Sequence, residues 1–163
     1  MKKALSALTL GLLTSLSSFQ VLANQAGDIT VSNPYAREVP PGAPASASFM
    51  GLKNSSGQAI KLVKATSGAA KAVELHTHTN DNGVMRMRQV AFFKIPANGQ
   101  NELKPGGDHI MLINPLKPLK AGQTVSVQLQ FEDGSTKQVD MPVKSVMQDM
   151  GKMNHDMHQH HHH

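Results

Sequence analysis

The side chains whose types and spacing could do chemistry together are two histidines and two methionines: His76, Met87, His109 and Met111. Ten residues separate His76 from Met87, and twenty-one separate Met87 from His109. His109 and Met111 are two residues apart, so on a β-strand both side chains point to the same face. Neutral imidazole nitrogens and thioether sulfurs form a soft ligand set, which suits Cu(I) better than other common biological metals.

Other kinds of metal site fit this chain less well. Ca²⁺ and Mg²⁺ require oxygen ligands, and Zn²⁺ could use the two histidines but gains little from methionine. The chain has no cysteine, which excludes thiolate zinc sites and blue-copper electron-transfer centres. A single strand histidine is more often solvated and a single strand methionine is more often core, so the prediction depends on all four residues together. His78 and Met85 lie on the same strand faces and are secondary candidates, or else exposed rim residues.

Short alternating or apolar runs, broken by Gly, Pro, Asn and Ser, indicate β-strands throughout the chain. Two of them, 72–79 and 84–90, flank an Asn-Gly hairpin turn, which would bring His76 and Met87 into the same neighbourhood. A Pro-Gly-Gly turn leads directly into the run 108–114, which carries His109. Roughly seven to nine such strands predict an all-β fold, an antiparallel sandwich or Greek-key barrel.

The first residues are typical of a secretory signal peptide, residues 1–23. Lys2 and Lys3 precede a short apolar run, and cleavage is expected after Ala23. A membrane anchor would need ~20 apolar residues, and neither this serine-rich run nor any later segment provides them. We therefore expect an exported protein with no membrane span.

Residues 24–145 are predicted to form one domain, followed by a flexible tail, 146–163. The formal net charge is +5, of which Lys2 and Lys3 supply two, and only five Phe and one Tyr are present. That composition does not favour nucleic-acid binding. His/Met-rich segments bind metals, so the tail offers candidate secondary ligands: Met147, Met150, Met153, His155, Met157 and His158. We favour a native tail, although the last four histidines could be a purification tag.

The spacing described above, with the segments VELHTH, GVMRMR and LKPGGDHIMLI, resembles the periplasmic copper chaperone family often called PCuAC. The resemblance covers roughly residues 28–143. It implies a cupredoxin-like β-sandwich in the periplasm with one Cu(I) at His76, Met87, His109 and Met111. It also implies copper delivery to the copper-bearing subunit of cytochrome c oxidase, at its binuclear centre, together with a Sco-type chaperone. The tail is similar to extensions that take part in binding a second copper ion, Cu(II).

The leading interpretation is thus a monomeric, non-catalytic copper carrier. The alternatives are a periplasmic copper sequestration or resistance protein, and a metal-free exported β-sandwich that acts as an interaction module. An enzyme is not indicated, because the sequence contains no Gly-x-Ser-x-Gly motif and no phosphate-binding glycine loop.

Overall fold

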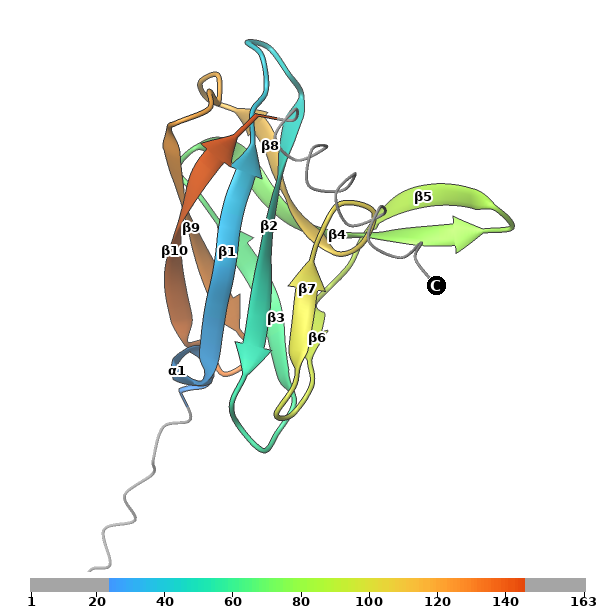
Figure 1. Ribbon diagram of the computed structural model, residues 1–163, viewed down its shortest axis with the longest axis vertical. Coiled ribbons are helices and arrows are strands. Elements are labelled where there is room, and N and C mark those ends of the chain that lie inside the picture. The colour runs from blue at the N-terminus through green and yellow to red at the C-terminus, as the bar shows by residue number, and fades with distance from the viewer. Residues whose placement is uncertain (1–23, 146–163) are drawn as a thin grey trace, which may run out of the picture.

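The computed structural model describes residues 24–145, and most of these residues belong to β-strands (Figure 1). Within this range no helix has the length and apolar character needed to cross a membrane. The elements in chain order are α1 (Gln25–Asp28), β1 (Ile29–Arg37), β2 (Ala45–Asn54), β3 (Ile60–Thr66), β4 (Ala70–Asp81), β5 (Val84–Gln89), β6 (Phe93–Ile95), β7 (Gln100–Leu103), β8 (His109–Pro115), β9 (Thr124–Phe131) and β10 (Thr136–Lys144).

The strands form one continuous sheet in the order β5-β4-β8-β2-β1-β10-β9-β3-β6, and β7 pairs with β2. Buried side chains from the β5–β1 half and the β10–β6 half form a single core, so the two halves pack face to face. The all-β sandwich prediction is confirmed. One pairing among the named strands is parallel, with Ala36 of β1 opposite Val143 of β10. No hairpin turn joins these two strands, so local sequence does not fix their relative direction.

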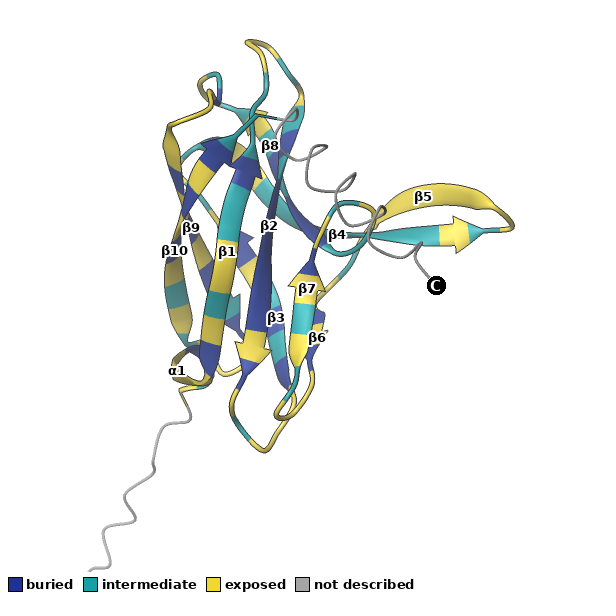
Figure 2. Ribbon diagram, in the orientation of Figure 1, coloured by how far each residue is buried: buried dark blue, intermediate teal, exposed yellow. Residues whose placement is uncertain are grey.

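Alternation of buried and exposed residues is clearest in β9 and β10, where it follows the two-residue period of a strand (Figure 2). In β9 the inward residues are apolar and fully or almost fully buried, while the residues between them are largely exposed. The inward set of both strands is Val125, Val127, Leu129, Phe131, Val139, Met141 and Val143. The side chains of this set pack against the half of the sandwich that carries the histidines, in one shared core.

A β-bulge interrupts β1 between Ser32 and Tyr35, where its pairing with β2 shifts register. Asn33 lies there with a φ of 47°, a left-handed conformation that asparagine tolerates better than most residues. Before the bulge Ile29 is inward, and after it Ala36 is inward. The extra residue therefore turns Tyr35 onto the outer face of the sheet.

Asn54, at the end of β2, is fully buried and holds neighbouring loops together. Its Nδ2 donates to the carbonyl oxygens of Gln58 (2.7 Å) and Pro96 (3.0 Å), and its Oδ1 accepts from the Ser56 backbone N–H (2.9 Å). Asn54→Ala leaves these buried groups unpaired, so urea unfolding should show a stability loss of about 2–3 kcal/mol. Asn101→Ala, at a partly exposed amide, should cost clearly less; an equal loss would contradict this role.

Candidate metal centre

Strands β4 and β5 form a hairpin arm that projects from the body of the domain (Figure 1). Every residue of β5 is exposed. The predicted turn is present: Asn82 and Gly83 both have positive φ, 54° and 87°, as a two-residue hairpin loop of this type requires. The Gly83 N–H also donates to the Asn80 side-chain oxygen at 2.7 Å. This turn fixes the register of the arm, with Met87 opposite His78.

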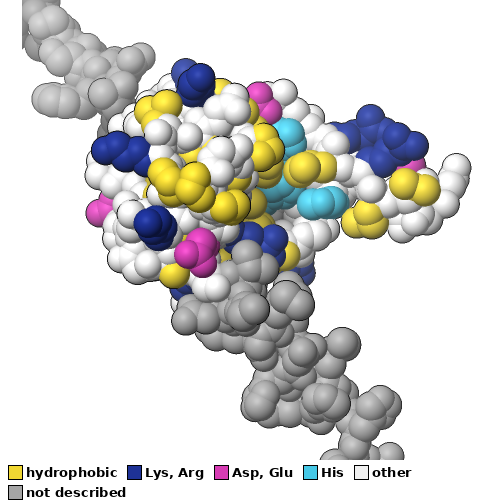
Figure 3. Space-filling model, turned by 90° about the horizontal axis from the view of Figure 1, so that it is seen from above, with side chains coloured by type: hydrophobic (Ala, Val, Ile, Leu, Met, Phe, Trp, Pro, Cys, Tyr) yellow, Lys and Arg dark blue, Asp and Glu magenta, His cyan; other side chains and the backbone are white. Residues whose placement is uncertain are grey.

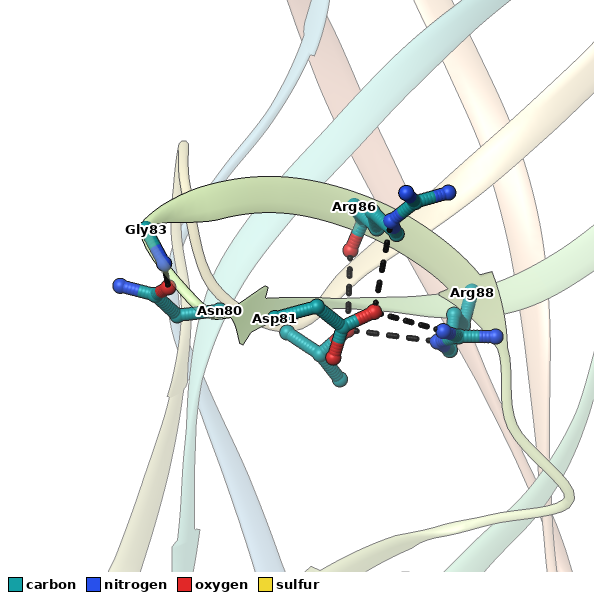
Figure 4. Close-up of polar contacts among 6 residues, drawn as sticks. Asn80, Asp81, Gly83, Arg86 and Arg88 are labelled. Carbon is teal, nitrogen blue, oxygen red and sulfur yellow. Dashed lines mark hydrogen bonds and ion pairs between the residues drawn. The ribbon is translucent and has the colours of Figure 1, made fainter.

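The two faces of the arm differ in chemistry. On one face Asp81 pairs with Arg88 (2.7 Å) and Arg86 (3.4 Å), as Figure 4 shows. These pairs are exposed, so each adds about 0–1 kcal/mol to stability. The opposite face carries His78 and Met87. Because both arginines of β5 lie on the first face, β5 contributes no cationic side chain to the face that carries the thioether and the imidazole.

The face that carries Met87 continues across β4 onto β8. His76 pairs directly with His109, and their ring centroids are 5.9 Å apart. The His78 ring lies 5.1 Å from the His109 ring. Figure 3 shows histidine side chains gathered where the arm leaves the body, with hydrophobic side chains among them. Imidazoles from two strands therefore converge at the base of the arm.

Met87 and His109 are in direct contact, with 3.0 Å between Sδ and Nε2. The other ring nitrogen of His109, Nδ1, lies 2.9 Å from the Gly107 carbonyl oxygen. Because a carbonyl can only accept, Nδ1 carries the proton and the Nε2 lone pair faces the sulfur. Gly106 lies in the turn just before this carbonyl and has a φ of 79°, a left-handed conformation that favours glycine. The turn orients the Gly107 carbonyl oxygen towards the His109 ring. The result is two soft donor atoms side by side.

A cavity of about 290 Å³ opens beside this contact. Its lining combines the candidate donors with apolar and cationic neighbours: Arg37, Ala47, Phe49, His78, Met87, Pro105, Gly106, His109 and Met111. A larger cavity of about 530 Å³ lies elsewhere, around Leu116 and Pro118, but no histidine or methionine lines it. Donor chemistry rather than size therefore identifies the smaller cavity as the candidate site.

Phe49 forms the floor of the site from the outer face of β2. It is buried, yet it does not belong to the core between the two halves of the sandwich. Its ring lies 5.2 Å from Tyr35 and 6.3 Å from His109, and the Arg37 guanidinium lies 5.1 Å from it. Burial lowers the pKa of the His109 imidazole below its ordinary value, and the neighbouring His78 and His76 lower it further, against the opposing Gly107 and Asp108 contributions. A neutral imidazole is the form that binds metals.

The lowered pKa of His109 should make stability depend on pH in a defined window. The unfolded chain takes up the His109 proton at pH about 6.5, while the folded state resists it. The contribution is therefore complete above that pH and is lost as pH falls towards the lower folded pKa. Urea unfolding of the metal-free protein at pH 7.5 and 5 should show this loss. His109→Gln should show a smaller loss, and an unchanged pH dependence would contradict the assignment.

The structure brings Met87, His109 and Met111 together around one cavity. His76 of β4 lies next to His109 of β8. It does not line that cavity, whereas His78 does. The predicted signal peptide, 1–23, and the tail ligands lie outside the described residues; the latter are Met147, Met150, Met153, His155, Met157 and His158. Within residues 24–145 no three His, Cys, Asp or Glu side chains form a group suited to a metal.

Sequence reasoning missed three neighbours of the site. The sequence does not mark Phe49 as a site residue, because an aromatic residue buried on the outer face has the same sequence pattern as a core residue. Arg37 depends on the bulge in β1 for its placement. Glu74 could have been found, since it lies two residues before His76 on the same strand face.

Comparisons with known proteins agree with this architecture. Residues 29–143 match the family model described as "Putative lipoprotein LpqE-like". The protein "Putative lipoprotein Lxx21020" of Leifsonia xyli subsp. xyli (strain CTCB07) is 40% identical over 129 residues, which are 78% of this chain and 76% of that protein.

Two solved structures share the fold. The Cu(I) form of DR1885 from Deinococcus radiodurans is 39% identical, with a TM-score of 0.57, covering 74% of this chain and 83% of that chain. The copper-bound PCuAC domain from PmoF2 is 21% identical with a TM-score of 0.62, covering 73% of this chain and 94% of that chain, and shows likeness of fold alone. With a sandwich of the PCuAC type and a family match that spans β1 to β10, the chain belongs to the LpqE-like family.

Proposed function

We propose that this protein is a periplasmic Cu(I)-binding metallochaperone. The observation that carries the proposal is the 3.0 Å contact between Met87 Sδ and His109 Nε2 at the edge of an open cavity. A tetrahedral ion bound to one sulfur and one nitrogen separates them by about 3.5 Å. A small opening of this contact admits an ion. Met111 lines the same cavity, so a second sulfur is within reach of it.

The donor set supports reduced copper as the cargo. Thioethers and neutral imidazoles add no charge, and soft sulfur ligands select Cu(I) over Zn²⁺ and the hard cations. The copper(I) form of the Deinococcus relative, 39% identical to this chain, supports the same ion. His76, Met87, His109 and Met111 are the proposed primary ligands, and His78 is a further imidazole that lines the cavity.

The position of the site supports a carrier that releases its ion. Met87 is 49% exposed and lies on an arm whose outer edge is not paired with another strand of the described sheet. A receiving protein can therefore approach the ion from the side of the arm. We propose cytochrome c oxidase, at the binuclear centre of its copper-bearing subunit, as the receiver, with a Sco-type chaperone as co-worker.

Export and the tail complete the proposal. Residues 1–23 act as a signal peptide, and a second copper ion, Cu(II), binds with participation of the His/Met-rich tail, 146–163. The "lipoprotein" name belongs to the relatives. This chain has no cysteine, the residue that carries thioether-linked lipid.

The test uses a deletion strain grown in scarce and in excess copper. A copper donor predicts loss of oxidase activity in scarce copper, restored by the wild-type gene but not by Met87→Ala. If only copper tolerance falls, the protein is a sequestration protein. If the purified chain binds no copper, the metal-free interaction module is the correct interpretation. Metal analysis of full-length and tail-deleted protein gives the stoichiometry.

A further inference from the structure

The paired imidazoles of His76 and His109 are held through different ring nitrogens. His109 uses Nδ1, which donates to the Gly107 carbonyl oxygen at 2.9 Å. His76 instead uses Nε2, which lies 2.7 Å from the Glu74 carboxylate oxygen. A carboxylate accepts hydrogen bonds, so the Nε2 position of His76 carries the proton in this contact. Each ring is thus left with one lone pair, on opposite ring positions.

The remaining nitrogen of His76 is unusual. Among residues 24–145, His76 Nδ1 is the one buried side-chain nitrogen or oxygen atom with no hydrogen-bond partner. An unpaired buried polar atom destabilises the folded state, and native proteins rarely keep one without a role. His76 lies beside His109 in the β4–β8 pairing. The unpaired atom therefore belongs to a ring whose centroid is 5.9 Å from that of His109.

Glu74 is placed to act on His76 through the sheet itself. It precedes His76 by two residues on β4, so both side chains are on one face. Across the sheet Glu74 pairs with Met111 of β8, so Glu74 neighbours one proposed sulfur ligand and contacts one proposed nitrogen ligand. Metal-binding histidines commonly donate their second N–H to a carboxylate, which fixes the tautomer and ring orientation.

We propose that Glu74 is a positioning residue that holds His76 with its Nδ1 towards the ion, so that copper is bound by Nδ1 of His76 and Nε2 of His109. This inference depends on the proposed copper function and adds the ring nitrogen used and the residue that selects it. Glu74 itself does not touch the ion. His78 lines the cavity without such a carboxylate, and its Nδ1 lies 3.4 Å from the Gly107 carbonyl oxygen.

The test begins without copper. Two-dimensional ¹H–¹⁵N spectra of the histidine side chains should show His76 in the Nε2–H form in the wild-type protein. Glu74→Ala should lose this preference, and Glu74→Gln should keep it, because the amide oxygen can still accept from Nε2–H. Glu102→Ala, which removes an exposed carboxylate on β7, is the matched control. A wild-type His76 in the Nδ1–H form overturns the inference directly.

Copper binding supplies the second readout. Cu(I) should shift the His76 Nδ1 resonance and the His109 Nε2 resonance. In competition with a Cu(I) chelator, Glu74→Ala should bind about 10- to 100-fold more weakly, whereas Glu74→Gln and Glu102→Ala should stay within about threefold of wild type. If Glu74→Ala keeps full affinity while His109→Ala loses it, copper binding stands and the role of Glu74 is wrong. If wild type itself binds no Cu(I), the proposed function fails first.

Discussion

Replacing Met87 by alanine is expected to lower the affinity for Cu(I) by at least about 100-fold, since loss of a direct ligand should exceed the loss of an outer partner. The sulfur of Met87 is the donor already in contact with His109 Nε2. Its side chain is 49% exposed, so the substitution creates no core cavity and the fold should be unchanged. Competition with a chromophoric Cu(I) chelator under reducing conditions measures the effect.

Met85→Ala is the matched control, because Met85 lies on the same face of β5 and is 55% exposed. Its expected change is less than about threefold. Equal losses for the two variants would mean that the arm binds copper through its methionines in general, and an unchanged Met87→Ala would remove Met87 from the site. In the double variant Met87→Ala/His109→Ala the losses should not add, because both residues contact one ion.

Phe131→Ala should be the most destabilising of the substitutions considered, with a loss of about 3–5 kcal/mol in the free energy of unfolding. Phe131 is fully buried at the end of β9, where truncation leaves a cavity between the halves of the sandwich. Phe92→Ala is the control, because that ring is 44% exposed and lies 5.2 Å from the Lys61 ammonium. Its expected loss is below about 1 kcal/mol. Urea unfolding at one pH measures both.

Affinity for copper separates packing from binding in this pair of variants. The folded fraction of Phe131→Ala should keep wild-type Cu(I) affinity, because Phe131 does not line the cavity at Met87 and His109. A loss of affinity in the folded protein would show that the two halves of the sandwich are coupled through the core. A loss of less than about 1 kcal/mol would mean that this part of the core repacks.

Local chemistry made much of the fold predictable. The hairpin followed from Asn82-Gly83, whose backbone conformation few other residues adopt easily. Residues 125–131 alternate strictly between apolar and polar side chains, which is the pattern of a half-buried strand, and they lie in β9. Strand β7 has no such pattern, because it is short and only Leu103 within it is buried. Its pairing with β2 comes from tertiary contact.

The sequence predicts which residues are candidate ligands, but it does not predict the register of the strands that carry them. The sequence placed His76 and Met87 in one neighbourhood, but the residue opposite Met87 is His78, and His76 faces Gln89 on that side. Two registers decide which histidine lines the cavity: that of β4 with β5, which the turn sets, and that of β4 with β8. The spacing of the four residues along the chain gives neither register. The position of Phe49 beside His109 could not be predicted, because no residue near it in the sequence indicates a buried ring on the outer face of the sheet.

The bulge in β1 allows this strand to lose one residue without a change in the wall of the cavity. Between Ser32 and Tyr35, β1 advances by three residues while its partner β2 goes back by two, from Gly51 to Phe49. Removing one residue there would leave a regular strand in which Tyr35 still pairs with Phe49 and Ala36 still faces the core. If the bulge were lost with no residue removed, Tyr35 and Arg37 would face the core instead. Homologues that keep the four proposed ligands can therefore lack one residue in this segment and retain the same wall beside the cavity.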